Sequence, residues 1–321
     1  MKRLFFIIIA FLFVACSSEL KQENNSTDKR VFATMPALTA LLEVLYPQGI
    51  IGLNYKPYPE DIKFMPENVA NLPVLGLKER INYEAVVALK PDIIIFAKPL
   101  DKAISKAYEE LGIKIIAISA EFKDIEESIR IYGENLGVEK RAEKLIAFHR
   151  KIKERLDELR VKILKKPRVY FAFGMEGLQT FCASKEHLDD DLAFQIGGEN
   201  VIECDSFHQR LLPMNYEQII TLNPEVIFVR EIALYKHLLN EPNSHWQRIE
   251  AVKNKRIYYA PSSPSNWLHK PPTVMRILGY PWGFSKLHPE LLSQKELESL
   301  VKDFFANFLR PLSDEDYESL K

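Results

Sequence analysis

Cationic and aromatic residues follow several of the apolar runs that the sequence predicts to be strands. Lys98 and Arg230 each come within two residues of the end of such a run, and Tyr55 and Tyr58 lie in a proline-rich loop. Arginine and lysine match the charge of an anion, while tyrosine packs on rings and donates hydrogen bonds. These residue types predict a site for an anionic chelate or an oxyanion, although both tyrosines could instead only brace their loop.

The other predicted strand ends supply further candidates for ligand contact. Their loops contain Met35, Met175, Trp267 and His269. The last of these loops is also rich in serine, and such a loop can present backbone amides to an oxyanion. Each of these residues has a purely structural alternative, because aromatic and sulfur-containing side chains also fill protein cores.

Motifs and charge exclude two classes of function. No GxSxG, HExxH, Walker or GxGxxG motif occurs at a suitable junction, so we predict neither an enzyme nor a cofactor. The acidic run at residues 189–191 is interpreted as a helix start, where carboxylates are favourable. Without Lys2 and Arg3 the chain has 41 basic and 44 acidic residues, which leaves no basic excess for nucleic acid.

Two cysteines lie outside the N-terminal region, Cys182 and Cys204. They form a disulfide if the chain meets an oxidising compartment, or they occupy separate places in the core. Their spacing is not that of a CxxC pair and gives no signal for a zinc site.

An internal duplication determines where these loops lie. Residues 82–96 read NYEAVVALKPDIIIF, and residues 215–229 read NYEQIITLNPEVIFV. Each copy predicts a short helix that ends at a proline, followed by an apolar run typical of a strand buried on both faces of a parallel sheet. The chain is therefore expected to form two similar α/β lobes, whose sheets bind ligands at the carboxyl ends of their strands.

A long helix is expected between the lobes. Residues 139–164 contain neither glycine nor proline and keep a helical spacing of apolar residues. One helix over this run would be about 39 Å long at 1.5 Å per residue. We therefore predict an N-terminal lobe over 29–122, connecting helices over 123–166, and a C-terminal lobe with terminal helices over 167–321.

The N-terminal region predicts export and a lipid anchor. Residues 1–15 combine a basic start with an apolar run too short to span a membrane, as in a signal peptide. Cys16 follows in the sequence FVAC, which resembles a lipobox, although Phe13 stands where leucine is usual. Residues 16–28 are polar and predict a flexible tether. An ordinary signal peptide with an incidental cysteine and a transmembrane anchor are the alternatives.

In its motifs the chain resembles the class III solute-binding proteins of ABC importers. This family binds iron–siderophores, haem, cobalamin and related metal compounds. The resemblance covers essentially the whole mature chain, and its C-terminal part is most similar to the branch with molybdate or tungstate binders and several iron- or nickel-complex binders. The matching segments are the opening strand and loop at 31–42, both NYE copies, the long helix, GGENV at 197–201 and AVKNKRIY at 251–258.

The resemblance implies a fold and a function. The expected fold is α/β, with two Rossmann-like lobes that have short central parallel sheets and are joined by one long helix. The expected function is capture of an iron complex of the siderophore type by a monomer at the periplasm or cell surface, and delivery to an ABC permease dimer with its ATPase. Molybdate or tungstate and nickel or cobalt complexes are the alternative ligands. A chelatase-like enzyme and a scaffold lipoprotein are alternatives from other classes.

The resemblance also implies roles for individual residues. In this family one glutamate on each lobe pairs with arginines of the permease, and Glu84 and Glu217 match those positions. His208 and Arg210 lie in a loop that often faces the ligand in the family, although an exposed surface loop is the alternative.

Overall fold

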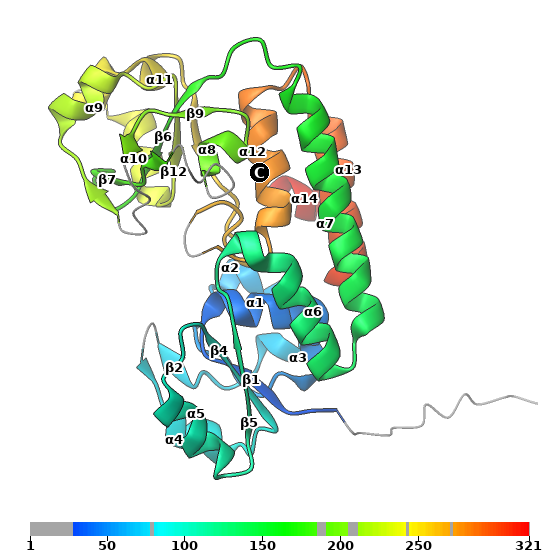
Figure 1. Ribbon diagram of the computed structural model, residues 1–321. Coiled ribbons are helices and arrows are strands. Elements are labelled where there is room, and N and C mark those ends of the chain that lie inside the picture. The colour runs from blue at the N-terminus through cyan, green and yellow to red at the C-terminus, as the bar shows by residue number, and fades with distance from the viewer. Residues whose placement is uncertain are drawn as a thin grey trace, which may run out of the picture.

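The computed structural model describes residues 28–77, 80–184, 191–204, 211–241, 244–269 and 272–320. Figure 1 shows one lobe at the bottom, a second at the upper left, and a layer of helices along the right side. Cys16 and the predicted signal peptide lie outside the described residues. Within the described ranges, none of the helices combines the length and apolar character that a membrane span requires.

A parallel sheet of order β1-β4-β5 forms the centre of the N-terminal lobe. Its middle strand, β4, is buried over four of its five residues, as expected for a strand covered on both faces. The strands are β1 (Val31–Ala33), β4 (Ile93–Ala97) and β5 (Lys114–Ile118), with a small antiparallel pair, β2 (Gly76–Leu77) and β3 (Arg80–Ile81). The helices of this lobe are α1 (Pro36–Leu45), α2 (Pro59–Ile62), α3 (Glu67–Ala70), α4 (Tyr83–Ala88) and α5 (Lys102–Glu109).

The C-terminal lobe has a parallel sheet of order β13-β12-β6-β9. Its strands are β6 (Arg168–Ala172), β9 (Glu199–Asn200), β12 (Val226–Val229) and β13 (Ile257–Tyr259). Two short pairs flank it, β7 (Gln179–Thr180) with β11 (Leu212–Pro213), and β8 (Ala183–Ser184) with β10 (Glu203–Cys204). The helices are α8 (Leu192–Gln195), α9 (Tyr216–Leu222), α10 (Ile232–Asn240) and α11 (Glu250–Lys253). The prediction of two α/β lobes with short parallel sheets is confirmed.

The duplicated segments fold in the same way in both lobes. Asn82 caps α4 by accepting a hydrogen bond from the amide of Ala85 at 3.0 Å. Asn215 caps α9 in a capping box with Gln218, in which both hydrogen bonds are 2.9 Å long. The asparagine of each NYE motif therefore fixes the start of a short helix, because its side chain satisfies an amide that lacks a partner within the helix. The strand that follows is the middle strand β4 in one lobe and the internal strand β12 in the other.

The long helix is shorter than predicted. Helix α7 covers Glu139–Arg160, 22 residues, which corresponds to about 33 Å. It follows α6 (Ile125–Leu136) after the left-handed Gly137. The helix ends before residue 164 because the chain turns to place Ile163 against the core beside Gly197 of the C-terminal lobe. This tertiary contact overrides a run of residues that would otherwise continue the helix.

Terminal helices join the lobes in addition to α7. They are α12 (Arg276–Leu287), α13 (Gln294–Phe308) and α14 (Asp314–Ser319), and they lie beside α7 in Figure 1. Phe305 of α13 packs edge-on against Phe64 of the N-terminal lobe, with 6.2 Å between ring centroids. Arg141 of α7 donates to the carbonyl oxygens of Val44 and Phe308, both at 2.8 Å. One hydrophobic core therefore continues from lobe to lobe, which stiffens the junction more than a single helix does.

The cysteines form a disulfide. Cys182 bonds to Cys204, which lies in β10, and so closes a loop between residues 22 positions apart. Of the two alternatives that the sequence left open, pairing is the one that the structure shows.

Candidate ligand-binding site

Two cations stand at corresponding strand ends of the two lobes. Lys98 follows β4, and Arg230 follows β12. Both side chains are exposed, and among the described residues neither forms a hydrogen bond or an ion pair. Because they leave the carboxyl ends of central strands, they lie where parallel α/β sheets bind ligands. Their free charges can therefore form charge-assisted hydrogen bonds with an anion.

The N-terminal lobe adds an exposed aromatic ring. Tyr58 is 69 % exposed and precedes α2. Tyr55 points inward instead, and its hydroxyl donates to Glu43 Oε1 at 2.6 Å. Met35 is partly buried against the core at the start of α1. The loop thus contributes one aromatic side chain that can cover a ligand and a second that fixes the loop to α1.

The residues of the C-terminal lobe that were predicted to contact the ligand differ in burial. Met175 follows β6 and is 68 % exposed, whereas Trp267 and His269 are buried. The indole Nε1 of Trp267 donates to the carbonyl oxygen of Ser263 at 2.9 Å. His269 Nε2 donates to the carbonyl oxygen of Val229 at 3.0 Å. Met175 can touch a ligand directly, while the other two support the loops from beneath.

Burial controls the charge of His269. Its side chain is 2 % exposed and packs against Phe171 and Phe173. Burial, against the hydrogen bond to Val229 and with smaller contributions from the charges of Arg230 and Arg276, lowers the pKa of His269 to about 3. The ring is therefore neutral at physiological pH and does not compensate a ligand anion. Arg230, which directly follows Val229, is the exposed cation at this strand end.

Two buried carboxyl groups lie behind the N-terminal loop. Glu43 on α1 is 1 % exposed, and Asp61 on α2 is also buried. Burial is the main cause that raises the pKa of Glu43, to about 7. The hydrogen bond from Tyr55 acts in the opposite direction, and the charge of Asp61 adds a smaller increase. Burial also raises the pKa of Asp61, against the hydrogen bond from Ser263. The sequence analysis did not single out these residues, although a lone glutamate in the apolar run PALTALLEVL was a usable signal.

The glutamates expected to meet a permease lie at matching positions. Glu84 is in the first turn of α4 and Glu217 in the first turn of α9, and both are exposed. Helices α4 and α9 lie on the left side of Figure 1, each at the outer end of its own lobe. His208 and Arg210 lie outside the described residues.

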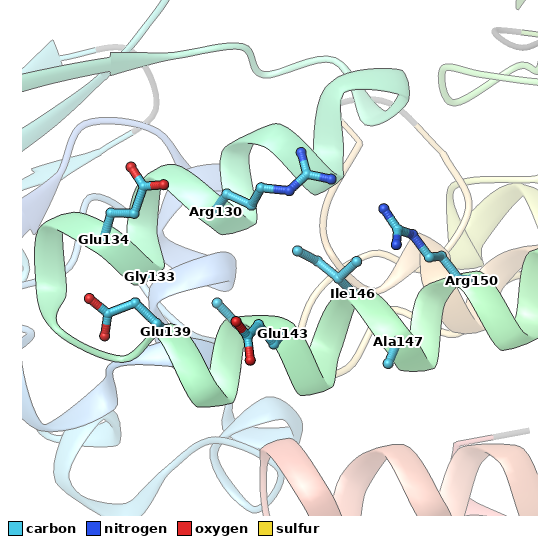
Figure 2. A pocket seen from close by; sticks show the side chains of 9 residues that line it. Arg130, Gly133, Glu134, Glu139, Glu143, Ile146, Ala147 and Arg150 are labelled. Atoms are coloured by element: carbon cyan, nitrogen blue, oxygen red, sulfur yellow. The ribbon is translucent and has the colours of Figure 1, made fainter.

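A separate pocket of roughly 400 Å³ lies between α6 and α7 and contains none of the predicted site residues. Figure 2 shows its two arginines, Arg130 and Arg150, on one side and glutamates on the other. Both arginines are paired with Glu126, at 3.3 and 2.7 Å, and three further glutamates line the pocket. This pocket suits an anion less well than the strand ends do. Among the described residues, no group of three or more histidine, cysteine, aspartate or glutamate side chains could hold a metal ion.

The two lobes with short parallel sheets have the fold of the class III solute-binding proteins of ABC importers, which are transport components without enzymatic activity. Residues 16–264 match the sequence profile of the periplasmic binding proteins, and the chain belongs to this family.

Three relatives illustrate the range of the family. An ABC transporter solute-binding protein from Sulfurospirillum deleyianum is 31 % identical, with a TM-score of 0.78 over 91 % of this chain and 93 % of that chain. The high-affinity heme uptake system protein IsdE of Staphylococcus aureus is 25 % identical over 260 residues, 78 % of this chain and 86 % of the relative. The molybdate-bound MolA of Haemophilus influenzae is 20 % identical, with a TM-score of 0.68 over 87 % of this chain and 92 % of that chain, and shares the fold.

Proposed function

We propose that this chain captures an anionic iron complex of the siderophore type outside the cytoplasmic membrane, as a monomer, and delivers it to an ABC permease. The observation that carries the proposal is the pair of exposed cations at equivalent strand ends, Lys98 and Arg230, whose side chains have no hydrogen-bond or ion-pair partner within the described ranges. Heme, named for the S. aureus protein, and molybdate, bound to the H. influenzae protein, both carry negative charge at neutral pH. A shared preference for anionic metal compounds is consistent with these free cations.

Exposed apolar surface favours an organic chelate over a small oxyanion. Tyr58 and Met175 are each more than two-thirds exposed and belong to different lobes. A bulky chelate covers such side chains and gains from removing them from water, whereas molybdate or tungstate needs only charge and hydrogen-bond donors. Molybdate remains the second candidate because the two cations alone would suffice for it, and nickel or cobalt complexes share the same chemistry.

The described residues favour a chelate that brings its own iron donors over haem. Haem requires an axial ligand from the protein. Of the described histidine and tyrosine candidates, His269 is buried and bonded to Val229, and Tyr55 is bonded to Glu43. Of the described site candidates, the exposed Tyr58 and Met175 could still reach a haem iron, and they do not form a tyrosine–histidine pair. A siderophore saturates its iron with its own oxygen donors and needs no such residue.

A thermal-shift screen of the purified chain tests the ligand class. A ligand at 100 times its Kd that binds only the folded state stabilises it by about 2.7 kcal/mol, which raises Tm by several degrees. We expect this shift with ferric catecholate, hydroxamate or citrate complexes and a smaller one with hemin, molybdate, tungstate, nickel–histidine and cobalamin. A shift with molybdate alone would contradict the assignment to an iron complex and would indicate an oxyanion-binding protein. No shift with any compound would contradict the proposal.

We further propose that Cys16 carries a lipid and that residues 16–28 act as a tether that keeps the receptor near its permease. The support is the apolar run before Cys16 and the polar composition after it. We expect a fatty-acid analogue supplied to cells to label the wild-type chain and not the Cys16→Ala variant. Equal labelling of both chains would show that Cys16 is not the site of lipid attachment.

A further inference from the structure

Four residues link the two lobes through buried polar contacts, and we call them the acid brace: Glu43, Tyr55, Asp61 and Ser263. The hydroxyl of Tyr55 donates to Glu43 at 2.6 Å within the N-terminal lobe. The hydroxyl of Ser263, from the loop after β13, donates to Asp61 in a buried contact across the lobe junction. The brace therefore ties α1, α2 and the proline-rich loop to a loop of the other lobe.

The brace continues to the predicted ligand contacts on both sides. Tyr58 lies between Tyr55 and Asp61, so both ends of its loop are held. The carbonyl oxygen of Ser263 accepts from the indole of Trp267 at 2.9 Å. Two residues later, His269 donates to the carbonyl oxygen of Val229, which precedes Arg230. A path of hydrogen bonds and short loop segments therefore runs from the loop of Tyr58 to the strand end that carries Arg230.

In the part of the chain that the structure describes, the surroundings of the brace contain negative charge without a compensating cation. Glu43 faces the hydroxyl of Tyr55 and the carboxyl of Asp61. Asp61 faces the Ser263 hydroxyl and the backbone amide of Tyr58, with Glu60 as a further negative neighbour. Among the described residues neither buried carboxyl forms an ion pair with lysine, arginine or histidine. Two buried carboxylates that repel each other are costly to ionise together, so the cluster is most stable when it keeps a proton.

We propose that the acid brace positions Tyr58 and Arg230 for the ligand, and that this positioning depends on a proton held by the buried carboxyl pair, so that the lobe junction loosens as pH rises above neutrality. The positioning role rests on the proposed function of the site, whereas the proton dependence of the junction does not. Glu43, Tyr55, Asp61 and Ser263 act through other residues and are positioning residues.

The sign of the pH effect follows from burial. The folded-state pKa of Glu43 is raised to about 7 from an ordinary value of 4.5. Between these values the folded chain holds more protons than the unfolded chain. The stabilisation linked to Glu43 is therefore complete below about pH 4.5 and is lost as pH rises through about 7. The raised pKa of Asp61 acts in the same direction.

Hydrogen exchange of the full, ligand-free chain at pH 6 and pH 8, corrected for intrinsic rates, tests the proton dependence. We expect segments 59–64 and 261–268 of the wild type to exchange several-fold faster at pH 8. Glu43→Gln keeps the shape and the hydrogen-bond acceptor for Tyr55 but cannot ionise, so this difference should disappear. Glu67→Gln, which changes an exposed glutamate on α3, should retain it. Equal exchange of the wild type at both pH values overturns the proton dependence.

Ligand affinity, measured with the ferric complex that gives the largest thermal shift, tests the positioning role. Between pH 6 and pH 8 the affinity of the wild type should fall about tenfold more than the affinity of Glu43→Gln does. Ser263→Ala should exchange rapidly in both segments at both pH values and bind weakly at both. If exchange changes with pH while affinity does not, the positioning role is wrong. If exchange changes while no probe binds at any pH, the proton-dependent junction stands and the proposed function fails.

Discussion

Charge reversal of both Glu84 and Glu217 is expected to reduce uptake at least about 100-fold, while ligand affinity stays within twofold of wild type. Both side chains are exposed in the first turn of a short helix, one on each lobe. Arginine at either place repels the arginines expected on the permease, and like charges across an interface cost several kcal/mol. Loss of a favourable helix-end charge costs only about 0.3–1 kcal/mol of stability per site. Uptake of radiolabelled ferric complex by cells, with binding measured on purified chains, checks both parts.

A matched variant separates docking from general charge effects. Glu67 and Glu139 are also exposed glutamates in first turns, of α3 and α7. The Glu67→Arg/Glu139→Arg chain has the same net charge as the Glu84→Arg/Glu217→Arg chain and should transport normally. Normal uptake by the Glu84→Arg/Glu217→Arg chain would show that these glutamates do not contact the permease.

Removal of both strand-end cations is expected to give the largest loss of ligand binding. A hydrogen bond to a charged group contributes about 1.5–3 kcal/mol, and 1.4 kcal/mol corresponds to a tenfold change in Kd. Lys98→Gln/Arg230→Gln should therefore raise Kd by roughly 1000-fold, and each single change by about 10- to 100-fold. Because both side chains are exposed and have no partner among the residues that the structure describes, stability should change little. Titration calorimetry with the best ferric complex, together with a denaturation curve, measures both quantities.

The control for this change uses exposed cations that lie within helices and not at strand ends. Lys144 on α7 and Lys236 on α10 have no ion pair among the described residues. Lys144→Gln/Lys236→Gln removes the same charge and should leave Kd unchanged. Equal weakening by both double variants would indicate a general electrostatic attraction and no site at Lys98 and Arg230.

The fold could be predicted from the sequence where the signal is local. Each NYE copy contains its own helix cap, its proline stop and its strand, so both lobes and their central strands followed from two short segments. Long-range packing could not be foreseen. Helix α7 ends early because Ile163 packs beside Gly197, and α13 returns to the N-terminal lobe through Phe305 on Phe64.

The candidate site shows the same limit. Strand ends were predictable, and Lys98 and Arg230 are exposed there. Burial was not predictable from residue type, and the depth of Trp267 and His269 restricts the ligand contacts that their residue types predict. The contact between Asp61 and Ser263 joins residues 202 positions apart, and no pattern in the sequence reports on it.

Native mass spectrometry with elemental analysis tests the central claim most directly. The purified chain is incubated with spent medium from iron-limited cultures and then freed of unbound solutes. The account predicts one iron-containing anion per chain, retained by wild type and lost from Lys98→Gln/Arg230→Gln. A wild-type chain that retains no iron complex, or that retains it equally well without the two cations, would contradict the account.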